Sequence, residues 1–237
     1  MAIIQARLNS ARLPGKALRD LVGQPLLRHV IDRALMIPGV EKVVLATHGE
    51  RDALALWIQQ TPIPDLRFGT RRWHEVAEDD VLERFVMTVQ SYEQPFDTIM
   101  RLTGDCPFLD PYLCADVLEA YRLWHEREGV EYVSNVHPGY LDGTDCEVFS
   151  REALMWAARE ATSSEDREHV TPWLRRHVKC RTLVDVEDYA WLKVSIDTEE
   201  ELHQMRALVR YLAPGAVRRA DTVAAAHAAG LFPVESL

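Results

Sequence analysis

The sequence lacks several patterns that would assign it to common classes of protein. The 237-residue chain has only four cysteines, and none forms a Cys-x-x-Cys pair or stands at zinc-ligand spacing. We therefore expect reduced thiols rather than a disulfide scaffold or a zinc site. No apolar run approaches the ~20 residues that a membrane-spanning helix needs, and the first residues do not have the layout of a signal peptide. The expected location is the cytoplasm, with no membrane partner.

The chain also lacks an excess of basic residues. Its formal net charge is −10, which argues against nucleic acid as a partner, because binding to a phosphate backbone needs a basic face. Within residues 1–33, however, six Arg or Lys residues stand against two acids, a local net charge of +4. This clustering predicts a focused site for a small anion rather than a general polyanion surface.

Two common nucleotide-binding motifs are absent as well. The sequence G-x-G-x-x-G does not occur, and segment 7–16 is not a P-loop because Ser10 stands where the first glycine of that motif belongs. The same segment nevertheless follows a short apolar strand and carries Arg7, Arg12 and Lys16 around a Pro-Gly turn. Backbone N–H groups and spaced cations in such a loop are suited to a polyphosphate. The alternative for any one of these residues is a solvated basic turn.

Short apolar runs alternate with amphipathic stretches, which predicts an α/β protein with a mainly parallel sheet and helices on both faces. The expected strands cover 2–6, 42–46, 98–102, 131–134, 145–149 and 191–196. The expected helices lie near 24–36, 51–60, 79–92, 111–127, 151–160, 164–176, 198–212 and 221–229. No repeat or linker interrupts this order, so a single domain is expected over 1–237. The helices after about 198 would pack on its outside or on a partner.

Polar residues follow three of the expected strands. The basic loop 7–16 follows the first strand, Asp105 follows the strand near 98–102, and Asp197 follows the strand at 191–196. Ligands of such sheets bind beyond the carboxyl ends of the strands, where carboxylates can hold Mg²⁺ together with phosphate oxygens. The alternatives are a helix N-cap for Asp197 and a turn residue for Asp105. A cation loop, two carboxylates and Mg²⁺ together describe nucleotidyl transfer.

These residues resemble the opening signature of the CMP-sugar synthetases, and most closely that of the spore-coat polysaccharide biosynthesis (SpsF-like) cytidylyltransferases. The signature runs from Gln5-Ala6-Arg7 to Gly15-Lys16. Six further blocks resemble the family in the right order, at 78–85, 103–107, 132–135, 145–149, 167–172 and 196–202. The resemblance implies a nucleotide-diphospho-sugar transferase (Rossmann-like) fold. It also implies a homodimeric, Mg²⁺-dependent enzyme that transfers CMP from CTP to a sugar or sugar acid for surface glycan biosynthesis and releases pyrophosphate.

The resemblance also implies roles for individual residues. It assigns nucleotide contacts to Arg7, Asn9, Ser10, Arg12, Lys16, Arg84 and Gly104, catalysis to Arg12, Lys16 and Asp105, and Mg²⁺ to Asp105 and Asp197. Candidates for acceptor contacts are Asp145, Glu147 and His169. Their alternatives are structural: a buried histidine that caps a helix, and acids that face water from a strand.

Three positions depart from the family: two in the basic loop bear on its turn and on one phosphate contact, and the third leaves the acceptor open. Asn9 and Ala11 replace residues that the family usually has in the loop, and Thr103 stands where octulosonate-type enzymes have Gln. Residues 71–76 look like an insertion, either a lid over the site or a plain surface loop. The acceptor could instead be a phosphonate or a polyol phosphate, the base could be uracil or guanine, and the chain could be a non-catalytic nucleotide-binding homologue.

Overall fold

The computed structural model describes residues 1–47, 53–61, 63–68, 76–93, 95–137, 139–184 and 187–231. Its strands are β1 (Ala2–Gln5), β2 (Val43–Ala46), β3 (Leu66–Phe68), β4 (Thr98–Thr103), β5 (Tyr132–Ser134), β6 (Glu147–Ser150) and β7 (Cys180–Thr182). Its helices are α1 (Leu26–Ala34), α2 (Ala53–Gln60), α3 (Val81–Gln90), α4 (Pro111–Glu128), α5 (Arg151–Glu160), α6 (Ser164–His169), α7 (Pro172–His177), α8 (Glu199–Val209) and α9 (Arg219–Ala228), with a 3₁₀ turn η1 (Lys16–Leu18).

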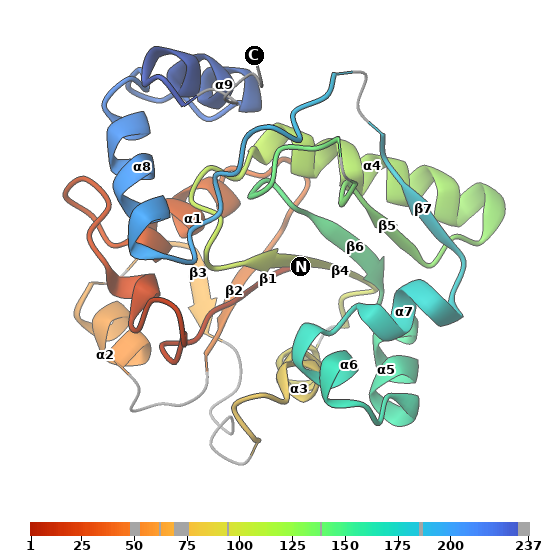
Figure 1. Cartoon of the computed structure of the whole chain (residues 1–237). Coiled ribbons are helices and arrows are strands. Elements are labelled where there is room, and N and C mark those ends of the chain that lie inside the picture. Colours follow the sequence, from red (N-terminus) through yellow and green to blue (C-terminus); the bar gives the residue numbers. More distant parts are fainter. Residues whose placement is uncertain are drawn as a thin grey trace.

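The seven strands form one sheet in the order β3-β2-β1-β4-β6-β5-β7 (Figure 1). Among them, β6 alone runs against its neighbours, and the other pairs are parallel. β1 lies between β2 and β4, with Gln5 opposite Ala46 on one side and Thr103 on the other. The carboxyl ends of β1 and β4 therefore meet at the same edge. The expected α/β class and mainly parallel sheet are confirmed.

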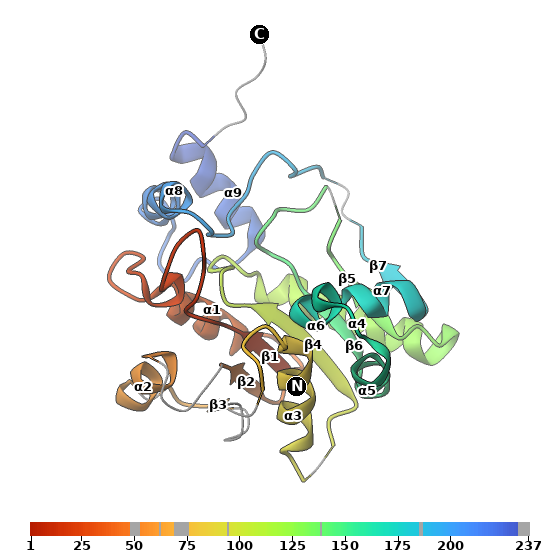
Figure 2. The same ribbon diagram turned by 60° about the horizontal axis from the view of Figure 1, so that its bottom comes forward.

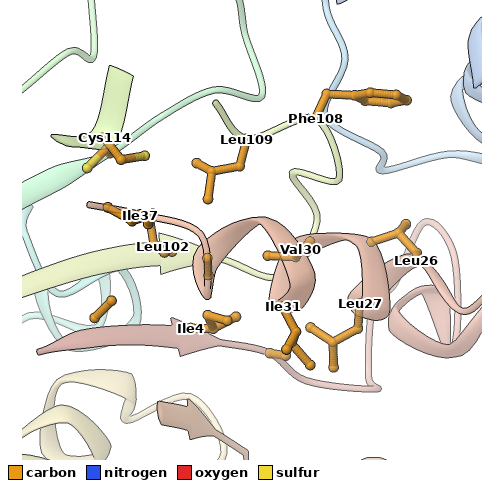
Figure 3. Close-up of a cluster of buried hydrophobic side chains, with 14 of the residues drawn as sticks. Ile4, Leu26, Leu27, Val30, Ile31, Ile37, Leu102, Phe108, Leu109 and Cys114 are labelled. Atoms are coloured by element: carbon orange, nitrogen blue, oxygen red, sulfur yellow. The ribbon is translucent and has the colours of Figure 1, made fainter. Parts of the chain in front are cut away.

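Helices cover both faces of the sheet, as predicted (Figure 1). One buried cluster joins the strands to α1, α2, α4, α8 and α9, and a second joins them to α3, α5 and α7. Figure 3 shows part of the first cluster, where Leu27, Val30 and Ile31 of α1 lie beside Ile4 of β1 and Leu102 of β4. The two C-terminal helices contribute buried side chains to this cluster, so they pack on the core of their own chain.

The expected strand at 191–196 is wrong. This segment makes one isolated bridge, between Lys193 and Asp142, and does not join the sheet ladder. Its apolar residues Val194 and Ile196 are fully buried, and the backbone N–H of Ile196 donates to the carbonyl of Asp105 at 3.0 Å. Burial against the end of the sheet therefore produced the apolar pattern that resembled a strand.

One helix and two strands also differ from the expectation. The predicted helix over 164–176 is two helices, because Val170 has a φ of 68° and Pro172 begins a new helix. The short strands β3 and β7 were not predicted. β7 is mostly exposed and reads Cys-Arg-Thr, which lacks the apolar run of a buried strand. In the described ranges, no helix combines the length and the hydropathy needed to cross a membrane.

Candidate active site

A cleft of about 350 Å³ opens at the carboxyl ends of β1 and β4. Figures 1 and 2 show the red segment that follows β1 on one side of this edge and helices α3 and α6 on the other. The cleft is lined by Gln5, Ala6, Arg7, Ser10, Ala11, Arg12, Lys16, Ala17, Val81, Arg84, Arg101, Thr103, Gly104, Asp105, Glu168, His169 and Asp197. The loop and the two aspartates that the sequence placed at one edge of the sheet are brought together.

The basic loop is shaped by its own backbone and held by one buried side chain. The N–H groups of Ser10 and Gly15 both donate to the carbonyl of Leu8, at 2.9 Å each. Gly15 has a φ of 68°, a conformation that glycine adopts without the strain of a side chain. Leu13 is 3% exposed and anchors the loop in the core, whereas the side chain of Arg12 is 65% exposed. The loop is thus fixed at its base and presents an exposed guanidinium group, which pairs with Asp197 at 3.1 Å.

Lys16 lies between the two predicted metal ligands. Its Nζ donates to Oδ2 of Asp105 at 2.8 Å, to Oδ1 of Asp197 at 2.9 Å and to the carbonyl of Ile196 at 3.2 Å. Burial lowers the pKa of Lys16, but the charges and hydrogen bonds of the two aspartates outweigh it, so the pKa is raised. Lys16 is therefore a permanent cation at the centre of this group.

Asp197 is not the N-cap of α8, contrary to the alternative reading of the sequence. Thr198 caps the helix, and Glu201 completes a capping box with it. The carboxylate of Asp197 instead accepts from Lys16 and also pairs with Arg12 at 3.1 Å and Lys193 at 3.3 Å. Burial raises the pKa of Asp197, but Lys16 and Lys193 outweigh this effect and lower it. Its oxygens carry a full negative charge at neutral pH.

The donor set of this cluster suits a hard cation. Asp105 and Asp197 offer only carboxylate oxygens, which are the ligands that a hard cation prefers. One positive charge, the ammonium group of Lys16, already lies between them and contacts each carboxylate. Across the described residues, no three acidic, histidine or cysteine side chains come together as a complete metal cage. Two carboxylates completed by phosphate oxygens and water is the arrangement that Mg²⁺ commonly adopts.

Two further arginines predicted to lie near the nucleotide line the cleft. Arg84 of α3 is only 1% exposed, and its Nη1 donates to the carbonyl of Glu78 at 2.6 Å. Its buried Nε has no hydrogen-bond partner in the part of the chain that the structure describes. Burial lowers the pKa of Arg84. The side chain of Arg7 pairs with Glu168 at 2.7 Å. Arg84 thus brings an incompletely satisfied cation to the cleft.

The remaining predicted nucleotide contacts divide into two groups. Ser10 and Gly104 line the cleft, whereas Asn9 does not, and the Nδ2 of Asn9 donates to Glu78 at 2.8 Å. Gly104 is tightly enclosed: a Cβ at this position would lie 2.9 Å from Cβ of Ala6. Its lack of a side chain lets the ends of β1 and β4 approach each other.

The three predicted acceptor residues are separated by the fold. His169 lines the cleft and is exposed, but Asp145 and Glu147 do not line it. The side chain of Glu147 is 2% exposed, so this acid does not face water as the alternative reading expected. Desolvation and the nearby charges of Asp142 and Glu147 raise the pKa of Asp145 to about 7. The segment 71–76 lies outside the described residues except for its last position.

Three further residues line the cleft, Gln5, Arg101 and Thr103, which form its floor on β1 and β4. The sequence patterns assigned no direct contact to Gln5 or Thr103 and did not single out Arg101. Arg101 interrupts the otherwise apolar strand Thr-Ile-Met-Arg-Leu-Thr, and its side chain is 12% exposed. This signal was available in the sequence, because a charged residue inside a central strand is unusual and, when buried, needs a partner.

Comparison with known proteins places these features in a family. The sequence profile of the family described as cytidylyltransferase matches residues 1–212. The spore coat polysaccharide biosynthesis protein SpsF of Bacillus subtilis is 29% identical, over 87% of this chain and 84% of the relative. A 3-deoxy-manno-octulosonate cytidylyltransferase of Anaeromyxobacter is also 29% identical, over 87% of this chain and 82% of the relative.

Solved structures share the fold at lower identity. A cytidylyltransferase from Leptospira borgpetersenii superposes with a TM-score of 0.86 at 21% identity, covering 100% of this chain and 97% of the other. The CMP:2-keto-3-deoxy-manno-octonic acid synthetase complexed with CTP superposes with a TM-score of 0.63 at 21% identity, covering 88% and 97%.

Proposed function

The chain belongs to the cytidylyltransferase family, and we propose that it transfers CMP from CTP to a sugar or sugar-acid acceptor. An acceptor oxygen attacks the α-phosphorus, the bond from that phosphorus to the α–β bridging oxygen breaks, and pyrophosphate leaves. The hydroxyl proton of the acceptor passes to solvent. The relative named for spore coat polysaccharide biosynthesis supports a use of the product in surface glycan assembly.

The observation that carries the proposal is the contact of Lys16 with both Asp105 and Asp197 at the mouth of the basic loop. Charge that develops on a transferring phosphoryl group is stabilised by cations already fixed around it. Lys16 is held in place before any substrate arrives, while the exposed Arg12 is free to turn from Asp197 to a phosphate. Together they supply two positive charges to the triphosphate.

Mg²⁺ is part of this proposal, and Asp105 and Asp197 would hold it. Mg²⁺ bound there would neutralise phosphate oxygens and so stabilise the departing pyrophosphate. The residues of the chain orient the triphosphate: the N–H groups and cations of the loop bind it, and Gly104 allows β1 and β4 to end close together beneath the loop.

Release of pyrophosphate tests the proposed function directly. The protein is incubated with Mg²⁺, each of the four nucleoside triphosphates, and a panel of acceptors comprising 3-deoxy-manno-octulosonate, a neutral sugar, a phosphonate and glycerol 3-phosphate. We expect release with CTP and an acidic sugar. If the protein binds CTP but releases pyrophosphate with none of the acceptors, the result would support a non-catalytic homologue. A preference for UTP over CTP would overturn the choice of base.

Asp105→Asn identifies the site within the same assay. The substitution removes one charge from the cluster and preserves shape, so the fold should persist while turnover falls at least 100-fold, since one such electrostatic contact is typically worth about 3 kcal/mol of barrier. Asp65→Asn is the matched control, because Asp65 lies in a surface turn outside the cleft. Full turnover in Asp105→Asn would exclude this carboxylate from the reaction.

A further inference from the structure

The floor of the cleft carries a cation whose side chain is oriented by buried partners. Arg101 of β4 donates from Nε to Oε1 of Gln5 on β1, at 2.8 Å, and from Nη1 to Oε2 of Glu147 on β6. These contacts hold its guanidinium across three neighbouring strands. Its Nη2 makes no hydrogen bond to any residue in the described ranges, and Arg101 lines the cleft. A fixed guanidinium with donors to spare is suited to an oxyanion.

The partner of Arg101 is itself fully engaged. Oε1 of Glu147 accepts from the hydroxyl of Tyr132 at 2.6 Å, from the hydroxyl of Thr171 at 2.7 Å and from Nη2 of Arg175 at 3.5 Å. Burial raises the pKa of Glu147, but the Arg101 charge and these hydrogen bonds outweigh it and lower it. The acid is therefore ionised and immobile.

Arg101 shares its buried partner with a second cation. Glu147 pairs with Arg101 and also, at 3.5 Å, with Arg175, whose side chain is 46% exposed. The nearby Asp145 does not supply a full second negative charge, because burial and neighbouring acids raise its pKa to about 7. One carboxylate divided between two guanidinium groups leaves Arg101 incompletely neutralised where it lines the cleft, so a bound anion is favourable there.

Arg101 is also separate from the cations assigned to the triphosphate. Lys16 contacts both Asp105 and Asp197, and Arg12 pairs with Asp197, beyond the carboxyl end of β4. Arg101 lies two residues before that end, and its contacts run along the sheet toward β6. The two groups of cations therefore serve different parts of the cleft.

On these grounds we propose that Arg101 binds the anionic group of the acceptor and that Glu147 is the residue that positions Arg101. This inference rests on the proposed cytidylyl transfer. It changes the role of Glu147, which the sequence offered as a direct acceptor contact, to an indirect one. The anion recognised is a carboxylate or a phosphate, and the experiment distinguishes the two.

The test compares charged acceptors with neutral counterparts in wild type and Arg101→Met. The probes are 3-deoxy-manno-octulosonate and its neutral amide for the carboxylate, and glycerol 3-phosphate and glycerol for the phosphate. We expect Arg101→Met to raise the KM of the charged acceptor about 10- to 100-fold, as for loss of a hydrogen bond to a charged group. The KM of CTP should stay within about twofold. The preference for the charged over the neutral probe should disappear in the variant.

Two further variants separate a positioning role from a merely structural one. Glu147→Gln should raise the acceptor KM less than Arg101→Met does and leave the KM of CTP unchanged, and Arg101→Lys should restore part of the preference for the charged probe. Arg181→Met is the matched control, because Arg181 is an arginine on β7 that pairs with Glu128 and is remote from the cleft. Circular dichroism and CTP-induced thermal shift confirm that each variant is folded.

The outcomes are distinguishable from those of the proposed function. If wild type releases pyrophosphate and Arg101→Met keeps the preference for the charged probe, the role of Arg101 is wrong while the function stands. The same holds if the KM of CTP rises with that of the acceptor. If wild type releases no pyrophosphate with any probe, the proposed function fails, and the assignment of Arg101 fails with it.

Discussion

Lys16 satisfies two carboxylates with one ammonium group, so this residue determines the charge state of the site. Its Nζ lies within 3 Å of Asp105 and of Asp197. Without Lys16 the two carboxylates would repel each other in a partly desolvated position. The same reasoning predicts that a divalent cation can replace it.

Lys16→Met tests both consequences. In the absence of Mg²⁺ we expect the free energy of unfolding to fall by about 1–2 kcal/mol, because the two aspartates lose their shared counter-ion. Added Mg²⁺ should then raise the melting temperature of the variant more than that of wild type, while turnover falls on the order of 100-fold or more. Lys179→Met, which removes a surface lysine that is 55% exposed, is the control. Equal responses to Mg²⁺ in Lys16→Met and wild type would contradict the shared cation site.

Gly104 sets the distance between the ends of β1 and β4. An added Cβ would lie 2.9 Å from Cβ of Ala6 and 3.0 Å from the carbonyl oxygen of Gln5, neither of which can move without the strand. Gly104→Ala should therefore destabilise the protein by about 1–3 kcal/mol and weaken CTP binding. Urea unfolding and titration with CTP measure the two effects. Unchanged stability would show that the ends of β1 and β4 can move apart by a few tenths of an ångström at little cost in free energy.

At the scale of elements, Asp110 joins two helices that are far apart in the sequence. Its Oδ1 accepts from the N–H groups of Tyr112 and Leu113 at the start of α4, and its Oδ2 accepts from the N–H of Arg219 at the start of α9. The carboxylate is 6% exposed. One side chain thus caps α4 and attaches α9 to the rest of the fold.

Asp110→Ala should cost about 2–3 kcal/mol of stability, since it removes the caps of two helices at about 1 kcal/mol or more each. Asp110→Asn keeps one acceptor oxygen but turns an NH₂ group toward one of the two helices, so its loss should be intermediate. Thermal unfolding monitored by circular dichroism measures both. A loss below about 0.5 kcal/mol in Asp110→Ala would show that α9 is held by its apolar contacts alone.

The helices and strands that the sequence predicted well are those with a strong local pattern. α4 has Asp110 as N-cap, Pro111 in its first turn and Gly129 at its end, so its bounds follow from the sequence. β7 and the segment 191–196 show the limit of such patterns. β7 is a strand because it pairs with β5, although it is mostly exposed, and 191–196 is buried without pairing. Whether each segment is a strand was decided by its pairing with a neighbouring strand and not by its local composition.

At the scale of the whole molecule, Asp145 links stability to pH. Its usual pKa of 3.8 is raised to about 7 by burial and by the charges of Asp142 and Glu147. The folded protein therefore binds this proton more tightly than the unfolded chain does. The resulting stability is fully present below pH ~4 and is lost as the pH rises toward 7.

Asp145→Asn removes this dependence because the amide does not ionise. As the pH rises from 4 to 7.5, the free energy of unfolding of the variant minus that of wild type should increase by about 2–4 kcal/mol. This increase corresponds to the stability that wild type loses when Asp145 ionises in the fold. Urea unfolding at a series of pH values measures the difference curve. A flat difference between the two proteins would mean that Asp145 titrates normally in the fold.

The sequence by itself determined the class of the fold and the edge of the sheet at which Lys16 and Asp105 lie. Alternating apolar runs and amphipathic stretches required a covered parallel sheet, and both residues follow strands that the structure contains. These placements depend on periodicity and on the position of a residue after a strand, which are local properties. Asp197 reaches the same edge for another reason, because the segment before it is buried there without forming a strand of the sheet.

Only the tertiary structure decided what lies on the floor of the cleft. Arg101 and Glu147 are 46 residues apart, and they meet because β6 runs antiparallel beside β4. No local pattern specifies that pairing. Side-chain partners across a sheet are set by register rather than by sequence distance. The register of β4 and β6 pairs Arg101, which lines the cleft, with Glu147, which does not.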